Sequence, residues 1–288
     1  MKIRTYLDKL EDMTDKKVIV TGGTSGIGLS LVKHLLSKNA KVVIMARNMI
    51  KAEEVKNKLL KIYPYAHISF IEYDQSNKTS VINACQEIII NHGDFYALIL
   101  NAGLIQSKKA TTYINDVPLT IYTNFVANSI IINRLLYKLN GHHRIIIQGS
   151  FVAGLKMKEI NTLKLHDLSA IKQYVISKMG VESLFYYYAN HTNDNLSFYL
   201  VEPGITNSEI IRDFPTIIRK LGHVFLKLFS HSTEKAALTA LKALQSDSGP
   251  GSYIIPRGFL SFMGYPKYRL FPERRKRSYL IDLLNEIE

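Results

Sequence analysis

Short runs rich in Val, Ile and Phe alternate with longer segments of helical periodicity along most of the chain. The runs are continuously apolar, which is typical of strands that are covered on both faces of a sheet. Because parallel strands need long crossover connections, this alternation predicts a doubly wound α/β fold with helices on both faces. We expect one parallel sheet of six to seven strands, lying within 16–23, 41–47, 67–74, 95–103, 143–150, 196–204 and 252–256.

The 288 residues contain no linker, internal repeat or low-complexity tract that would separate two domains. We therefore interpret 1–288 as a single domain. Residues 205–235 interrupt the rhythm of strands, which is typical of an excursion that closes over a pocket as a lid. A basic C-terminal helical segment is expected after the last strand.

Hydrophobic residues make up 47% and charged residues 21% of the chain, as in an ordinary globular protein. The single cysteine, Cys85, excludes an intramolecular disulfide and is typical of a reducing compartment. No apolar run reaches membrane-spanning length, and the first residues do not resemble a signal peptide. We expect a soluble, cytoplasmic protein.

Basic residues outnumber acidic ones by 37 to 24, and their densest cluster is "ERRKR" at 273–277. We interpret this cluster as a solvated basic surface, with a phosphate-bearing ligand or an anionic membrane surface as the alternatives. The sequence has no RNA-binding signature, no helix-turn-helix pattern and no paired Cys/His spacing. Neither a nucleic-acid partner nor a metal ion is therefore expected.

The first predicted strand ends in the glycine-rich stretch "TGGTSGIG" at 21–28, which also begins the first long helix. Gly22, Gly26 and Gly28 lack Cβ atoms where the backbone must approach a phosphate or pack closely on a strand. The helix N-terminus adds unpaired N–H groups and a partial positive charge. The stretch predicts a site for the pyrophosphate of a dinucleotide, and hence a Rossmann-type domain.

Six further segments follow in order: "YD" at 73–74, "NAG" at 101–103, "YTNFVANSIIINRLLYKL" at 122–139, "GSFVAG" at 149–154, "YVISK" at 174–178 and "PGITNSEI" at 203–210. Together with the Gly-x-x-x-Gly-x-Gly turn, they resemble the classical short-chain dehydrogenase/reductase family from about residue 16 to 285. Two positions depart from the family pattern, since Leu100 replaces the usual Asn and Ser208 the usual Thr. The 24 positions from Ser150 to Tyr174 resemble the retinol-dehydrogenase-like branch.

The resemblance implies a catalytic set of four residues, which are Asn124, Ser150, Tyr174 and Lys178. It also implies a larger set that binds a nicotinamide dinucleotide. Its members are Thr21, Gly22, Thr24, Ser25, Gly26, Ile27, Gly28, Arg47, Asp74, Asn101, Ala102, Gly103, Tyr174, Lys178, Pro203, Gly204, Ile205 and Ser208.

The chemistry of these side chains agrees with that assignment. Hydride transfer to a carbonyl leaves negative charge on the oxygen, which a positioned acid must neutralise. Tyr174 would be that acid, and the ammonium of Lys178, one helical turn away on the same face, would lower the pKa of the phenol. Ser150 would hold the substrate oxygen beside it. The resemblance implies that Asn124 orients Lys178 through a water.

The end of the second predicted strand bears on the choice of cofactor. A carboxylate at this place binds the ribose 2′-hydroxyl of NAD, whereas an Arg accommodates the 2′-phosphate of NADP. The residue here is Arg47, and no acidic residue follows until Glu53. The sequence therefore favours NADP(H) over NAD(H), although Ser25 stands where some NADP-dependent members carry a second basic residue.

We expect an NADP(H)-dependent oxidoreductase that interconverts a carbonyl and an alcohol. The family resemblance implies a homodimer or homotetramer. The basic, amphipathic segment 214–230 is interpreted as a lid that favours a lipophilic substrate, with peripheral membrane contact as the alternative. A catalytically silent dinucleotide-sensing or scaffold protein on the same fold is the alternative function.

Overall fold

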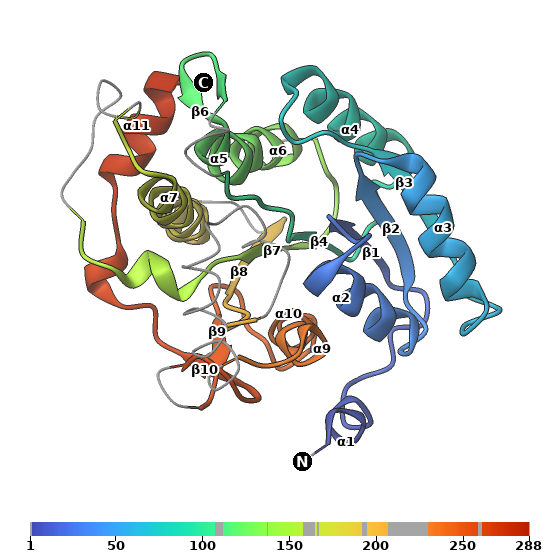
Figure 1. Ribbon diagram of the computed structural model, residues 1–288. Coiled ribbons are helices and arrows are strands. Elements are labelled where there is room, and N and C mark those ends of the chain that lie inside the picture. The colour runs from blue at the N-terminus through green and yellow to red at the C-terminus, as the bar shows by residue number, and fades with distance from the viewer. Residues whose placement is uncertain are drawn as a thin grey trace, which may run out of the picture.

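The computed structural model describes residues 2–106, 112–136, 138–157, 165, 167–191, 195–206, 230–258 and 261–287 (Figure 1). The predicted cofactor ligand Ser208 and residues 214–229 of the expected lid or membrane segment lie outside these ranges. The strands are β1 (Lys17–Thr21), β2 (Lys41–Ala46), β3 (Ile68–Glu72), β4 (Ala97–Leu100), β5 (Tyr113–Ile114), β6 (Val117–Pro118), β7 (His143–Gln148), β8 (Leu196–Val201), β9 (Tyr253–Pro256) and β10 (Pro266–Arg269). The α-helices are α1 (Ile3–Leu7), α2 (Gly26–Leu36), α3 (Met49–Leu60), α4 (Lys78–Asn91), α5 (Leu119–Ile121), α6 (Ala127–Leu136), α7 (Ala170–His191), α9 (Thr233–Ala236), α10 (Leu238–Ala243) and α11 (Tyr279–Ile287).

Within the described ranges, one sheet of eight strands runs in the order β10-β9-β8-β7-β4-β1-β2-β3. All neighbouring strands from β9 to β3 are parallel, as the β–α alternation predicts. The expected count of six to seven strands omits β10, which pairs antiparallel with β9 at the edge of the sheet. Its sequence "PKYR" begins with proline and is mostly polar, so it lacks the apolar run that marks the other strands.

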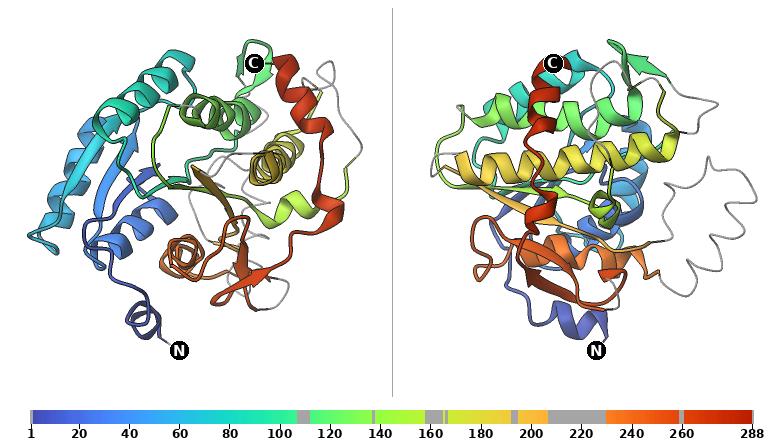
Figure 2. Two further views of the ribbon diagram at one scale, coloured as in Figure 1. Left: turned by 180° about the vertical axis from the view of Figure 1, so that it is seen from behind. Right: turned by 90° about the vertical axis from the view of Figure 1, so that its left-hand side faces the viewer.

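Helices cover both faces of the sheet, as Figures 1 and 2 show. Helices α4, α6 and α7 lie on one face and share a buried cluster that includes Leu98, Phe125 and Met179. Helices α2, α3 and α10 lie on the other face, where Leu31 and Leu241 belong to a second cluster. The continuous apolar strands thus supply the core on both sides, which confirms the predicted α/β class.

Helix α7 packs closely against the chain around Phe125. A Cβ atom on Gly180 would lie only 2.5 Å from Cγ of Phe125, so this approach requires a glycine. A stripe of this helix at helical spacing is buried, and its members are Ile176, Met179, Gly180, Ser183 and Leu184. Close packing therefore fixes α7, and the side chains it carries, relative to the neighbouring helix.

Helix α11 packs on α7, and Figure 2 shows it crossing that helix. Leu280, Leu283 and Leu284 enter the same core cluster as α7. Helix α11 therefore covers part of α7 within the chain, and the expected homodimer or homotetramer stays a prediction. None of the helices in the described ranges combines the length and the hydropathy that a membrane span requires.

The basic cluster at 273–277 is only partly on the surface. Arg274 is exposed, whereas Arg275 is 6% exposed and lies in the short 3-10 turn η7 (Glu273–Arg275) that precedes α11. The interpretation of this cluster as a solvated surface is therefore wrong for Arg275. The cause is a set of buried carboxylates that pair with its side chain.

Candidate active site

The glycine-rich turn between β1 and α2 has the geometry of a phosphate cradle. Gly22 and Gly26 have φ values of 70° and 54°, in the left-handed region that favours glycine. A Cβ atom on Gly28 would lie 2.3 Å from the carbonyl oxygen of Gly22, so a larger residue would force the turn open. The first turn of α2 thus packs directly on the end of β1.

The N-terminus of α2 offers donors for an anion. Leu29 N donates to Ser25 O at 3.0 Å, so the amides of Gly26, Ile27 and Gly28 have no partner within the helix. The Ser25 side chain makes no capping hydrogen bond. A Cβ atom built on Gly26 would meet no atom within 4 Å, which means that this side of the turn faces open space. These features fit the pyrophosphate of a dinucleotide.

Thr21 and Asn101 join the ends of β1 and β4. The Thr21 hydroxyl accepts from the amides of Asn101 at 3.0 Å and Ala102 at 2.8 Å, and Asn101 Nδ2 donates to Thr21 O at 2.9 Å. Thr21 is fully buried. Both side chains therefore shape the cradle through contacts within the protein.

The strand order places the predicted residues in a row along one edge of the sheet. Pro203, Ser150, Asn101, Gly22 and Arg47 follow the C-terminal ends of β8, β7, β4, β1 and β2, which are successive neighbours. Asp74 continues the row after β3, and its carboxylate accepts from the Ser76 amide and hydroxyl. Arg47 is exposed at the end of β2 and forms no hydrogen bond or ion pair with the other described residues.

Tyr174, Lys178 and Ser150 meet between α7 and the end of β7. Ser150 lies close enough to the Tyr174 phenol to act on its pKa. Lys178 Nζ lies 6.0 Å from the centre of the Tyr174 ring and donates to Gln148 O at 3.0 Å. Three of the four predicted catalytic side chains are thus brought together from segments that the sequence separates by up to 28 positions.

The pKa values in this cluster differ from the sequence-based expectation. Burial raises the pKa of Tyr174, and the hydrogen bond from Ser150 opposes that rise. Burial also lowers the pKa of Lys178 to about 8. The expected lowering of the Tyr174 pKa by Lys178 is not found, because the ammonium is directed at the Gln148 carbonyl rather than at the phenol oxygen.

Asn124 lies in a π-helical turn, η2 (Tyr122–Val126), between α5 and α6. Its side chain accepts from Leu104 N at 2.9 Å and donates to Leu104 O at 2.8 Å and Ser177 Oγ at 3.0 Å. The Asn124 carbonyl accepts from Asn128 Nδ2 at 2.8 Å. π-Helical turns inside helices are frequent at functional sites. Asn124 thus links the segment after β4 to helix α7. Its contact on that helix is Ser177, the residue before Lys178.

Gly103 completes the contact between this cluster and β4. A Cβ atom at Gly103 would lie 3.2 Å from Asn124 Oδ1 and 3.8 Å from Lys178 Nζ. The "NAG" segment is therefore adjacent to Asn124 and Lys178.

His231 is a residue of this site region that sequence reasoning missed. Its Nε2 donates to Pro203 O at 2.6 Å, and its backbone N donates to Ile205 O at 3.0 Å. Gly204 has a φ of 77°, and a Cβ atom there would lie 2.4 Å from Phe262 O and 3.0 Å from His231 Nε2. His231 thus braces the Pro-Gly turn from 28 residues away, a separation that no local pattern reveals.

The lowered pKa of Lys178 predicts how stability depends on pH. Between pH 8 and 10.5 the unfolded chain binds a proton that the native Lys178 does not, so native stability rises with pH across this window. We expect the free energy of unfolding of the wild type to rise relative to that of Lys178→Met by up to about 3 kcal/mol. Denaturant unfolding at several pH values measures this difference.

Lys172→Met is the matched control, because Lys172 lies on the exposed side of the same helix. Its stability is expected to follow the wild type at every pH. Parallel curves for the wild type and Lys178→Met would contradict the prediction.

Comparison with known proteins identifies the family. The family model described as short chain dehydrogenase matches residues 16–216. Polyprenol dehydrogenase from Homo sapiens is 26% identical over 210 residues, which cover 69% of this chain and 63% of that protein. The 3-keto-steroid reductase/17-beta-hydroxysteroid dehydrogenase 7 from Homo sapiens is 38% identical over 96 residues, or 33% of this chain and 28% of that protein. The matched regions thus span less than two thirds of either relative.

Two solved structures show the same fold. An uncharacterized protein from Mycobacterium paratuberculosis has a TM-score of 0.73 at 19% identity, covering 98% of this chain and 97% of its own. A short chain dehydrogenase from Burkholderia cenocepacia, solved in complex with NADP, has a TM-score of 0.66 at 18% identity, covering 84% and 96%. With the glycine turn, the Ser–Tyr–Lys cluster and the family match in agreement, this chain belongs to the short-chain dehydrogenase/reductase family.

Proposed function

We propose that this protein is an NADP(H)-dependent oxidoreductase that interconverts an alcohol and a carbonyl, with Tyr174 as its acid and base. The observation that carries the proposal is the position of Lys178 beside the Tyr174 ring and the end of β7, with Ser150 close by, at the sheet edge that also holds the glycine turn. Family membership supports a nicotinamide-dependent redox reaction at this edge.

The turn at Ser25, Gly26, Ile27 and Gly28 would hold the pyrophosphate, and the bound dinucleotide would supply or accept a hydride. Tyr174 would donate its phenolic proton to the substrate oxygen in reduction and remove the hydroxyl proton in oxidation. Ser150, bonded to Tyr174, would fix the substrate oxygen beside the phenol. These roles need the phenol and the hydroxyl close together, which the interaction between Ser150 and Tyr174 supports.

Lys178 would return the proton to Tyr174. Its lowered pKa of about 8 leaves the ammonium mostly protonated near neutral pH, yet able to release a proton at modest cost. Asn124, which is 1% exposed, holds the chain after β4 against α7 through Leu104 and Ser177. We propose that this contact keeps Lys178 in register with the cofactor edge.

The choice of NADP(H) rests on Arg47. Its guanidinium is exposed at the end of β2, where it is free to pair with a 2′-phosphate. We expect Arg47→Asp to change the NADPH-to-NADH ratio of kcat/KM by about 10–100-fold toward NADH, since it removes a charge-assisted hydrogen bond and adds repulsion. Steady-state kinetics with both cofactors measure the ratio.

Lys58→Asp is the matched control for charge, because Lys58 is exposed further along helix α3. This variant is expected to keep the wild-type ratio. An unchanged ratio in Arg47→Asp would remove Arg47 from the choice of cofactor.

The substrate class is proposed to be lipophilic. Relatives named polyprenol dehydrogenase and 3-keto-steroid reductase/17-beta-hydroxysteroid dehydrogenase 7 support this proposal. The test is a screen of aldehydes, ketones, retinoids, steroids and polyprenols that follows NADPH consumption or NADP reduction, with Tyr174→Phe as the inactive reference. Turnover of polar substrates alone would contradict the lipophilic class, and no turnover of any carbonyl or alcohol would contradict the proposed function.

A further inference from the structure

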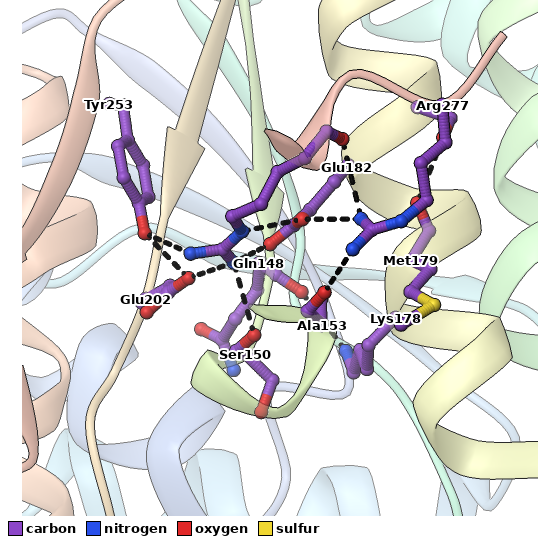
Figure 3. Close-up of polar contacts among 11 residues, drawn as sticks. Gln148, Ser150, Ala153, Lys178, Met179, Glu182, Glu202, Tyr253 and Arg277 are labelled. Atoms are coloured by element: carbon purple, nitrogen blue, oxygen red, sulfur yellow. Dashed lines mark hydrogen bonds and ion pairs between the residues drawn. The ribbon is translucent and has the colours of Figure 1, made fainter. Parts of the chain in front are cut away.

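Arg275 lies in the interior although it belongs to the most basic stretch of the sequence. Its side chain is 7% exposed, whereas the neighbouring Arg274 is exposed and Lys276 pairs with Glu273 at the surface. Figure 3 shows the polar contacts that gather Glu182, Glu202, Tyr253 and Arg277 at the end of β7. The Arg275 guanidinium is bonded to three of these residues.

All three nitrogen atoms of the Arg275 guanidinium donate hydrogen bonds. Nε donates to Glu182 Oε2 at 2.9 Å, and Nη2 donates to Glu182 Oε1 in a bidentate pair. Nη2 also donates to Glu202 Oε1 at 2.5 Å, and Nη1 donates to Tyr253 Oη at 2.8 Å. A planar fork with fixed donors suits this set, whereas an ammonium could satisfy only part of it.

A weaker contact reaches the catalytic segment itself. Arg275 Nη2 lies 3.4 Å from the carbonyl oxygen of Ser150. Arg277 continues the contact, since its Nη2 donates to Ala153 O at 2.9 Å in the 3-10 turn η3 (Phe151–Gly154) that follows Ser150. The C-terminal segment therefore supports the backbone on which the catalytic hydroxyl is carried.

The other partners of Arg275 also adjoin the proposed active site. Glu182 follows Lys178 by four positions, so the two side chains leave α7 on the same face. Glu202 directly precedes the Pro203–Gly204 turn at the end of β8. The Arg275 side chain thus contacts three segments. One contains Ser150, one is the helix of Tyr174 and Lys178, and one leads into the Pro-Gly turn.

Two carboxyl groups and two guanidinium groups meet in this cluster. The side chains of Glu182 and Glu202 are 0% and 2% exposed; Arg275 pairs with both of them, and Arg277 pairs with Glu182. Burial raises the pKa of Glu202 to about 7, while the hydrogen bond from Tyr253 opposes that rise. Loss of the guanidinium would leave a buried carboxylate unpaired, so the three segments would have to move to reach water or another donor.

We infer that Arg275 is a positioning residue for catalysis, which holds Ser150 in register with Tyr174 and Lys178. This inference rests on the proposed function, because it assumes that these three side chains carry the reaction. Displacements near 1 Å in a reacting geometry cost about 10²-fold in rate. Arg275 forms no hydrogen bond with the side chain of Ser150, Tyr174 or Lys178. Its expected effect is therefore on the geometry of these side chains.

The test compares Arg275→Lys with Arg274→Lys. Arg275→Lys keeps the positive charge but removes the planar guanidinium group. Arg274→Lys makes the same change at an exposed neighbour. We expect Arg275→Lys to lower kcat by about 10–100-fold, with a smaller change in the Kd of NADPH because the glycine turn that would hold the pyrophosphate lies across the sheet edge from Arg275. Arg274→Lys is expected to match the wild type in both quantities.

A second variant separates positioning from stability. Arg275→Met/Glu202→Met replaces one cation and one carboxylate of the cluster by apolar side chains and leaves Glu182 paired with Arg277, and such replacements often preserve or raise stability. We expect it to unfold near the wild-type temperature while kcat stays low. A kcat within twofold of wild type in either folded variant would overturn the inference, and so would failure of both to fold, since Arg275 would then serve stability alone. Activity in Tyr174→Phe would instead overturn the proposed function.

Discussion

Replacing Tyr174 by Phe is expected to lower kcat by about 10²–10⁴-fold, the usual contribution of a positioned acid or base. The substitution removes one oxygen and keeps the ring, so the packing of α7 is retained. Ser150 loses a hydrogen-bond partner, but the cradle at Gly22, Gly26 and Gly28 lies across the sheet edge and is unaffected. The Kd of NADPH should therefore remain close to that of the wild type, as measured by fluorescence titration.

Tyr187→Phe is the matched control for this experiment. Tyr187 lies on the same helix and is 40% exposed, away from the catalytic cluster. It is expected to keep full activity. Wild-type turnover in Tyr174→Phe would remove the proposed acid and base and would favour another proton donor.

The second large effect is expected at Gly28. A Cβ atom there would meet Gly22 O at 2.3 Å and Asn101 Nδ2 at 2.6 Å, and both atoms belong to the contacts that join β1, α2 and β4. Because backbone must move to admit the methyl group, we expect Gly28→Ala to lower the free energy of unfolding by about 3 kcal/mol. NADPH binding should weaken at least about tenfold, since a loss of only 1.4 kcal/mol corresponds to that factor.

Gly249→Ala serves as the control, because a Cβ atom at Gly249 meets nothing within 4 Å and its backbone is not in the left-handed region. Its stability and NADPH affinity should equal those of the wild type. Thermal unfolding with and without NADPH measures both effects. Unchanged unfolding and binding in Gly28→Ala would show that the turn can relax at no cost.

Local patterns were sufficient to predict most of the fold. Most of the parallel strands are continuous apolar runs, because both of their faces are buried, and this composition is visible in a single sequence. Strand β3 departs from this pattern, since Ser69 and Glu72 are exposed. The order of the strands in the sheet also decides which loops meet, so residues that follow strand ends could be assigned to one edge. Strand β10 was missed because an edge strand that begins with Pro266 carries no such run.

The candidate site was predictable where it depends on local geometry and not where it depends on distant partners. Tyr174 and Lys178 share a helix face by spacing alone, and the glycine turn depends on a short stretch. Arg275 pairs with Glu182 and Glu202 from 93 and 73 positions away, so the sequence presented it only as one of several surface cations. The direction of the Lys178 ammonium depends likewise on the Gln148 carbonyl, 30 positions away.

The late position of Arg275 has a consequence for synthesis on the ribosome. All the residues assigned to the proton transfer have been translated by Lys178, and Glu202 follows soon after, but the cation for both carboxylates arrives 73 residues after Glu202. Domains generally fold as units, so this one cannot complete its core before Arg275 has been translated. A chain interrupted before residue 275 would bury two carboxylates without their guanidinium, at a cost of about 3–5 kcal/mol. Prematurely terminated chains would thereby remain loosely folded substrates for proteases, and only completed chains would acquire a working catalytic centre.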